Sequence, residues 1–449
     1  MTSTLRRIFN LWQIPKWLYM KSTATFSYQP TDRIQILARL YGIKNELKQR
    51  TLAYNLGALY TLPHPFAVHA YASFLDQNPN HLGHWADQPP KEATLQLEYE
   101  VIQAMINLYH ARGKNLTGYI TSGATEGNIF SAWLGKTYLR QYSTPDKMRL
   151  LLTSLTHYSI RKSADICNMK RVTVGLNRNT WSIDPFDLEH TARRLYKQGI
   201  RGLLIPLTIG YTSIGTSDDV EAISRLTVQL QKKMPGLRIF LWIDAAMQGL
   251  VAPFTTDFQP FLHANIQACV VDFHKFGQVP YPAGLIIYKR QLKSLIEQPI
   301  EYLQETDATL LGSRPGAPVA AMWSMMHFFG KKGYQQIVDK QMNNKRYFIK
   351  QLNGILPQTQ ILTDEHTLSC GLIFHSFKGS RLPKQIEDRY WFHADTSSIF
   401  FHPNQHKKLI IYKCFFLPHM TKKVIINFMN DIQSYVEYSP HSRINKKNI

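Results

Sequence analysis

The chain has 449 residues, of which 44% are hydrophobic, 12% aromatic and 18% charged. This composition excludes an intrinsically disordered chain, a coiled coil and a collagen-like fibre, and the length allows a large core with more than one domain. Lysine and arginine number 52 against 31 acidic residues, a formal net charge of +21, but the basic residues are spread along the whole chain. The charge therefore indicates a basic surface and does not by itself predict a nucleic-acid or membrane partner.

The cysteine and histidine patterns predict neither disulfides nor a metal site. The four cysteines lie far apart, with no CxxC pair: Cys167, Cys269, Cys370 and Cys414. His402 and His406 enclose Pro403, which keeps them from sharing a helix face. No run approaches the ~18 apolar residues needed to cross a bilayer, and the N-terminus lacks the apolar segment of a signal peptide. We expect a cytoplasmic protein.

Two helical patterns open the chain after an N-terminal extension of about thirty residues. The apolar residues recur at three- and four-residue spacing, first at Ile34, Leu37, Ala38 and Tyr41, then at Leu97, Val101, Met105 and Leu108. Residues 61–90 between them are rich in proline and histidine. That connection is too irregular for one element and long enough to carry function.

From about Gly118 short apolar runs alternate with helical segments. The predicted strands are 150–153, 172–174, 202–207, 239–243, 268–271 and 285–288, several of them apolar on both faces as buried parallel strands are. Residues 187–198 and 218–233 are typical of helices with acidic first turns. A long helical pattern over 315–348 is followed by strands at 372–374 and 409–414 and a helix at 422–436.

These elements predict an α/β fold with a mainly parallel sheet and a small α+β C-terminal domain. We divide the chain into an extension (1–30), a helical and loop segment (31–117), a large domain (118–330) and a small C-terminal domain (331–449).

Four short motifs follow predicted strands, at the edge where open α/β sheets bind ligands. Each has an ordinary structural explanation when taken alone. The turn 122–125 of TSGATEGN can simply cap a helix, Asp244 can cap the next one, Lys275 can be a surface lysine, and His157 can be a structural histidine.

Together the four motifs match the needs of one cofactor, pyridoxal phosphate. It requires a lysine for a Schiff base, an acid to keep the pyridine nitrogen protonated, an anion cradle for the phosphate, and a flat group over the ring. Lys275, Asp244, the turn at 122–125 and His157 supply these in turn.

With these motifs the chain resembles the group II pyridoxal-phosphate-dependent amino-acid decarboxylases, and most closely their histidine decarboxylase and plant serine decarboxylase branch. The resemblance runs from about Asn55 to Cys414. Six motifs carry it in family order: TSGATEGN (121–128), THYS (156–159), TIGYTSIGTSDD (208–219), IDAAMQG (243–249), HKFGQVPYPAG (274–284) and IEYLQETDATLLGSR (300–314).

The resemblance implies a fold-type I enzyme with a large seven-stranded domain, a small C-terminal domain and a homodimer with active sites at the interface. It implies that Lys275 forms the Schiff base, Asp244 pairs with the ring nitrogen, His157 stacks on the ring and Ala246 packs against its other face. The remaining implied roles are the phosphate site (Ser122, Gly123, Ala124, His274), a contact to the phenolic oxygen (Thr212), proton return to the α-carbon (Tyr302) and the substrate motif (Asn80, Gly83, His84).

Four positions depart from the family pattern and bear on substrate choice. Tyr211 stands where a small hydroxyl is usual, so we expect a bulky phenol near the site. Asp272, three residues before the lysine, replaces a small residue and either points away from the phosphate or weakens its binding. His84 replaces an acid, and residues 315–317 lose two polar groups. The substrate is therefore left open among histidine-like and other polar amino acids, with an anionic one as a further option.

The sequence analysis leads to decarboxylation of an L-amino acid to the amine and CO₂ and keeps two alternatives. One is another pyridoxal-phosphate lyase acting at the α-carbon, because such enzymes share the lysine and the aspartate. The other is a degenerate homologue that binds a polyanion or partner without turnover, which the +21 charge and the departures favour but the intact Lys275, Asp244 and His157 oppose.

Overall fold

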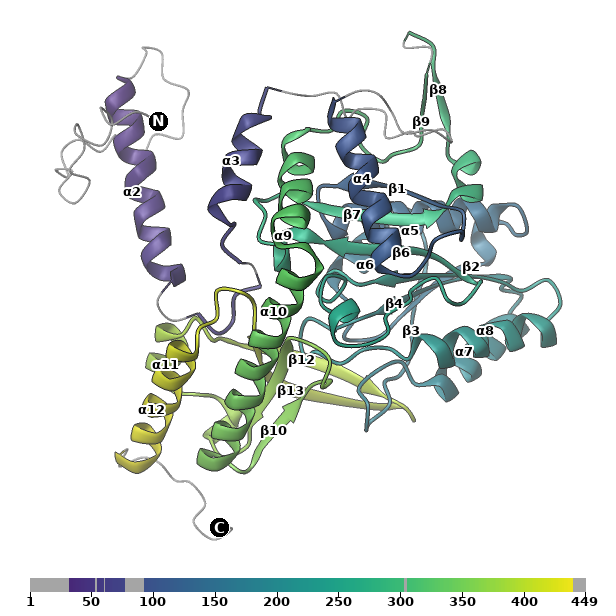
Figure 1. Ribbon diagram of the computed structural model, residues 1–449. Coiled ribbons are helices and arrows are strands. Elements are labelled where there is room, and N and C mark those ends of the chain that lie inside the picture. The colour runs from purple at the N-terminus through teal and green to yellow at the C-terminus, as the bar shows by residue number, and fades with distance from the viewer. Residues whose placement is uncertain (1–31, 53–54, 60, 77–92, 303–304, 439–449) are drawn as a thin grey trace. The chain divides into compact units, whose positions relative to one another are not determined.

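The computed structural model describes residues 32–52, 55–59, 61–76, 93–302 and 305–438 (Figure 1). The chain divides into two units, Met1–Asn55 and Leu56–Ile449. In the first unit the described element is helix α2 (Arg33–Leu52), which agrees with the first helical pattern. The remaining elements belong to the second unit. The division of the chain at residues 30, 117 and 330 stays a prediction.

A seven-stranded sheet forms the centre of the second unit. Its strand order is β1-β7-β6-β5-β4-β2-β3. The pairs from β3 through β6 are parallel, whereas β7 runs antiparallel to both of its neighbours. The strands are β1 (Leu116–Thr121), β2 (Met148–Leu152), β3 (Arg171–Thr173), β4 (Gly202–Thr208), β5 (Arg238–Asp244), β6 (Ile266–Asp272) and β7 (Gly284–Lys289). The predicted α/β fold with a mainly parallel sheet is confirmed.

Helices cover this sheet, which explains its apolar strands. Every residue of β1 and β4 is buried, because packed helices leave neither face to solvent. Helix α5 packs across β4 to β7, and α4 packs against β1 and β7. The helices of this part are α4 (Ala93–Leu108), α5 (Ala124–Arg140), α6 (Tyr158–Ile166), α7 (Pro185–Lys197), α8 (Val220–Lys233) and α9 (Phe273–Phe276).

Acidic residues cap α7 and α8, the two helices that were predicted with acidic first turns. The Asp184 carboxylate accepts the backbone N–H groups of Phe186 and Asp187 at the start of α7. Asp219 accepts the N–H of Ala222 in α8. Such caps satisfy amide groups that have no partner within the helix.

A second, four-stranded antiparallel sheet in the order β10-β11-β13-β12 lies in the C-terminal part. Its strands are β10 (Thr359–Leu362), β11 (Ser369–Phe374), β12 (Ala394–Phe401) and β13 (Gln405–Phe415), with helices α11 (Lys384–Arg389) and α12 (Lys422–Tyr438) beside it. Helix α10 (Ala317–Ile355) is broken at Gly330 and runs from the large sheet to this small one (Figure 1). The predicted C-terminal helix and two of the four strands are confirmed.

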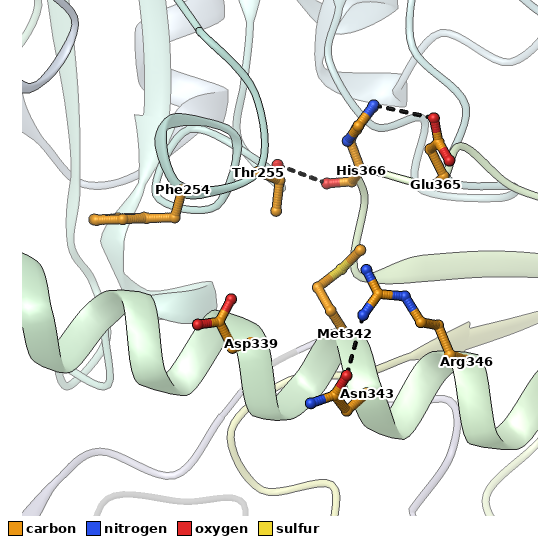
Figure 2. A pocket seen from close by; sticks show the side chains of 8 residues that line it. All are labelled: Phe254, Thr255, Asp339, Met342, Asn343, Arg346, Glu365 and His366. Carbon is orange, nitrogen blue, oxygen red and sulfur yellow. Dashed lines mark hydrogen bonds and ion pairs between the residues drawn. The ribbon is translucent and has the colours of Figure 1, made fainter.

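Buried hydrogen bonds and an ion pair join the irregular segments to the helices. Lys345 of α10 donates to the carbonyl oxygens of Asp364 and Thr367, at 2.5 and 2.7 Å. Figure 2 shows the hollow of about 540 Å³ beside this junction, across which Thr255 donates to the His366 carbonyl. Arg314 pairs with Glu98 of α4, and both side chains are buried.

Some elements were not predicted. The connection at 61–90 contains helix α3 (Pro65–Ser73), begun by His64 as N-cap. Strands β8 (Gln298–Ile300) and β9 (Glu305–Asp307) form a hairpin that projects from the body (Figure 1). Four short 3-10 helices complete the described elements: η2 (Pro145–Lys147), η3 (Ala252–Phe254), η4 (Arg290–Leu295) and η5 (Lys378–Ser380). Among the described residues no helix is both long and apolar enough to cross a membrane, and the four cysteines are free and buried.

Candidate active site

The predicted site residues lie where β5 and β6 end and α5 begins. Asp244 is the last residue of β5, and Asp272 is the last residue of the neighbouring strand β6. Lys275 follows directly in the single turn of α9. Because the carboxyl ends of parallel strands share one edge of the sheet, the acid and the lysine meet there.

Lys275 lies beside a carboxylate. Its Nζ is 3.1 Å from Asp272 Oδ2, and its side chain is 14% exposed, so the amine is mostly shielded but still reachable. His274 Nε2 is 3.6 Å from the same oxygen, and His274 Nδ1 accepts the Ala283 N–H. Burial lowers the pKa of His274, and the Asp272 carboxylate opposes this only in part. The imidazole is therefore neutral at pH 7.

The Asp244 carboxylate is buried and held by two donors. Its Oδ2 accepts from Asn128 Nδ2 at 2.8 Å, and its Oδ1 accepts the Ala246 N–H at 3.1 Å. Asn128 is itself fully buried, and its Oδ1 accepts the indole N–H of Trp242 at 3.0 Å. The carboxylate thus has a fixed orientation at the end of its strand.

His157 belongs to the same group of residues. It is the N-cap of α6, and its Nδ1 lies 2.8 Å from Ser159 Oγ, which in turn is 3.1 Å from Asn128 Nδ2. Burial lowers the pKa of His157, the Asp244 carboxylate raises it, and the Lys275 charge lowers it again. A neutral, flat ring is therefore held within electrostatic reach of both Asp244 and Lys275.

The start of α5 forms a narrow backbone cradle. Gly123 has φ 137°, a conformation that favours glycine, and a Cβ there would meet the His274 ring at 3.1 Å. The Ser122 N–H donates to Glu126 Oε2 at 2.7 Å, and the Ala124 N–H donates to Asp272 Oδ1 at 2.6 Å. The Asp272 carboxylate therefore faces the start of α5, where the resemblance predicts the phosphate.

Tyr211 does not line the site, contrary to expectation. Its side chain is 1% exposed and packs in the core with Leu155 and Trp181. Its hydroxyl donates to Asp218 at 3.0 Å, and burial raises the pKa of Tyr211 well above its ordinary value. Thr212, the next residue, is half-buried in the turn after β4.

The structure does not bring Tyr302 to these residues within the chain. Its side chain is 86% exposed beside β8. Asn80, Gly83 and His84, the predicted substrate motif, lie outside the described residues. The roles assigned to these four residues remain predictions.

Asn128 and Ser159 are site residues that sequence reasoning missed. Both lie inside motifs that the sequence analysis singled out, TSGATEGN and THYS. The only available signal was that each is a polar residue on a helix that packs on the sheet. Their partners depend on how α5 and α6 are rotated over β5, which spacing does not reveal.

The residues present fit pyridoxal phosphate. A partly shielded lysine, a buried and oriented carboxylate, a neutral imidazole and a cradle that a Cβ would fill occur together at one sheet edge. Two carboxylates oppose a phosphate in the cradle, because Asp272 accepts the Ala124 N–H and Glu126 accepts the Ser122 N–H.

The sequence profile of the pyridoxal-dependent decarboxylase conserved domain matches residues 72–376. The chain belongs to this family. The protein is therefore a decarboxylase that uses pyridoxal phosphate, and its fold is the fold-type I architecture of these enzymes.

Similar proteins act on several amino acids. The chain is 29% identical to the L-aspartate/L-glutamate decarboxylase of Pyrococcus horikoshii over 405 residues, which cover 87% of this chain and 94% of that protein. It is also 29% identical to a probable L-tyrosine/L-aspartate decarboxylase of Methanosphaera stadtmanae over 398 residues, covering 85% and 92%. The structure of Lactobacillus brevis glutamate decarboxylase has a TM-score of 0.74 at 17% identity, covering 97% of this chain and 96% of that one.

These relatives correct the branch chosen from the motifs. The family assignment holds, but the similar proteins are aspartate and tyrosine decarboxylases and do not belong to the histidine and serine branch. The departures at His84 and at residues 315–317 were the reason not to carry histidine or serine specificity over to this chain.

Proposed function

We propose that this enzyme decarboxylates an acidic L-amino acid, in the first place L-aspartate, to β-alanine and CO₂. The proposal rests on the two relatives named above, whose names both include aspartate. Lys413 in β13 is the cation we assign to the substrate's second carboxylate, because its charge contributes to lowering the pKa of His157. Lys413 pairs with Asp395, whose side chain is 52% exposed. A weak surface ion pair exchanges readily for a substrate carboxylate.

We assign the cofactor site as the resemblance predicts. Lys275 would hold the cofactor covalently, with Asp244 at the ring nitrogen and His157 and Ala246 against the two faces of the ring. The other assignments are the phosphate contacts (Ser122, Gly123, Ala124, His274) and the phenolic-oxygen contact (Thr212). Shielding of Lys275 and the neutral His157 ring support these roles.

When bound, pyridoxal phosphate supplies an electron-accepting ring that takes up the electron pair left by the departing carboxylate. The chain's own part is orientation and electrostatics. Asp244, fixed by Asn128 and the Ala246 N–H, holds a proton on the ring nitrogen. The half-buried, neutral His157 would cover the ring and exclude water without adding a positive charge.

The cofactor site is tested by the absorption of the purified protein with pyridoxal phosphate. A lysine-bound cofactor absorbs above roughly 400 nm. We expect this band in the wild type and its absence in Lys275→Ala. A band that survives the substitution would contradict the assignment of Lys275.

The substrate proposal is tested by CO₂ release from aspartate, glutamate, tyrosine and histidine. We expect the highest kcat/KM with aspartate, and a KM for aspartate raised about 10–100-fold in Lys413→Met, as for loss of a charged hydrogen bond. Lys408→Met, on the exposed part of the same strand, is the matched control and leaves KM unchanged. Higher kcat/KM with tyrosine, or an unchanged KM in Lys413→Met, would contradict the proposal.

We further propose a homodimer in which Tyr302 reaches the site of the second copy and returns the proton to the α-carbon. The exposed position of Tyr302 on a projecting hairpin supports this arrangement. Mixing Lys275→Ala with Tyr302→Phe chains then yields hybrid dimers with one intact site, and about a quarter of wild-type activity returns. If no activity returns, Tyr302 does not act in the partner's site.

A further inference from the structure

The Asp272 carboxylate makes three contacts at the point where the cofactor phosphate and the cofactor carbon are expected. One oxygen accepts the Ala124 N–H at 2.6 Å, and the other lies 3.1 Å from Lys275 Nζ and 3.6 Å from His274 Nε2. These three partners are the residues assigned to the phosphate and to covalent attachment. Asp272 thus engages several groups of the proposed cofactor site at once.

The backbone leaves this carboxylate little freedom. Asp272 pairs with Gly284 in the ladder between β6 and β7, and its side chain is 5% exposed. A Cβ at Gly284 would lie 3.0 Å from Asp272 Oδ1, and a Cβ at Gly123 would lie 3.3 Å from it. The carboxylate oxygen therefore lies directly over two glycines, in space that larger residues would fill.

An anion bound at a helix start is favoured by free N–H groups and by the helix dipole. Asp272 already accepts a hydrogen bond from one such N–H group, that of Ala124, and places its negative charge in the cradle. A phosphate carries about two negative charges, and like charges in a shielded site repel strongly. Covalent attachment also requires Lys275 Nζ to leave its carboxylate partner.

We propose that Asp272 acts as an internal competitor for the cofactor: its carboxylate holds Ala124 and Lys275 in the empty enzyme and must yield both when pyridoxal phosphate binds. The inference rests on the proposed cofactor site at Lys275. Asp272 is a positioning residue here, and it sets how tightly and how fast the cofactor is captured.

The test uses Asp272→Asn in the full-length chain freed of cofactor. Asparagine keeps the size and one acceptor oxygen for the Ala124 N–H but removes the charge. We expect at least a tenfold lower Kd for pyridoxal phosphate and faster growth of the absorption band. Asp187→Asn is the matched control, because Asp187 is another buried carboxylate that accepts a backbone N–H, that of Gly175. It leaves the Kd for the cofactor unchanged.

Inorganic phosphate provides a second readout that does not involve Lys275 chemistry. We expect phosphate to raise the Tm of Asp272→Asn more than that of the wild type at equal concentration. Asp272→Ser replaces the asparagine variant if the latter does not fold. Equal or weaker cofactor binding in the neutral variant would overturn the inference. Absence of the band in the wild type would instead show that the cofactor site itself is wrongly assigned.

Discussion

Replacing Asn128 by leucine tests whether the orientation of Asp244 matters for catalysis. The substitution nearly keeps the volume of the side chain but removes its donor to Asp244, 2.8 Å away, and its acceptor for Trp242, 3.0 Å away. Because Trp242 is fully buried, no water can replace the lost acceptor of its indole N–H. An unpaired buried donor costs about 1–3 kcal/mol, and a lost hydrogen bond to a charged group about 1.5–3 kcal/mol.

The sum predicts a loss of about 2.5–6 kcal/mol in the free energy of unfolding of Asn128→Leu. At saturating cofactor the misoriented Asp244 retains only the Ala246 N–H, and we expect kcat to fall about 10–100-fold, as for one charged hydrogen bond. Urea unfolding and CO₂ release measure the two effects separately. Ser131→Ala on the same helix loses one buried hydrogen bond, to the Gly127 carbonyl, and serves as control with unchanged kcat. A kcat for Asn128→Leu within threefold of wild type would refute the reasoning.

Three further outcomes follow from buried groups. Burial raises the pKa of Asp218 from 3.8 to about 6, so the folded state holds a proton that the unfolded state has lost, and stability falls by about 3 kcal/mol as pH rises through this window. Burial lowers the pKa of His419 from 6.5 to about 4, where the unfolded state holds the extra proton, and stability rises with pH by a similar amount. In urea unfolding between pH 4 and 6.5 we therefore expect the free energy of unfolding of the wild type to change little with pH. It should rise with pH in Asp218→Asn and fall with pH in His419→Leu. The same pH dependence in all three proteins would contradict both assignments. Arg314→Met removes the cation that pairs with the fully buried Glu98, whose carboxylate still accepts the Ile120 N–H, and lowers the unfolding free energy by about 3–5 kcal/mol; a loss below about 1 kcal/mol would contradict this. Gly123→Ala forces a side chain into positive φ and against His274, so the cofactor Kd rises at least tenfold in an absorption titration, whereas an unchanged Kd would place the phosphate elsewhere.

The buried strands could be predicted because helices cover both of their faces. The runs expected for β2 and for β4 to β7 agree with the structure to within two residues at each end, since a strand shielded on both sides is largely apolar. The run expected for β3 is shifted by one residue, and its Arg171 and Thr173 are exposed. Strand β1 was missed because Thr117, Gly118 and Thr121 interrupt its apolar pattern. Gly118 is required there, since a Cβ would collide with the Ile286 carbonyl. That contact depends on a strand far along the chain, so local sequence does not reveal it.

The site was predictable to the level of positions, not of side-chain directions. Asp244, Lys275 and His157 meet because parallel strands end at one sheet edge, a rule that spacing can use. Tyr211 follows a strand in the same way, yet its phenol points into the core because Asp218 and the Ile183 and Thr208 amides form a buried polar group there. Direction is decided by such packing between distant segments, and the sequence pattern carries no signal for it.

The position of β1 at the edge of the large sheet has a consequence for biosynthesis. β1 is the first strand of that sheet to leave the ribosome, but its one ladder partner is β7, residues 284–289. At translation rates of about 5–20 residues per second, its buried residues wait on the order of ten seconds or more for that partner. A strand that is buried in the folded protein but still unpaired is prone to aggregate through its open edge, so the nascent chain is a natural client for a chaperone until β7 emerges. Translation products that stop before residue 284 would contain Lys275 and Asp244 but leave β1 without its partner in the sheet.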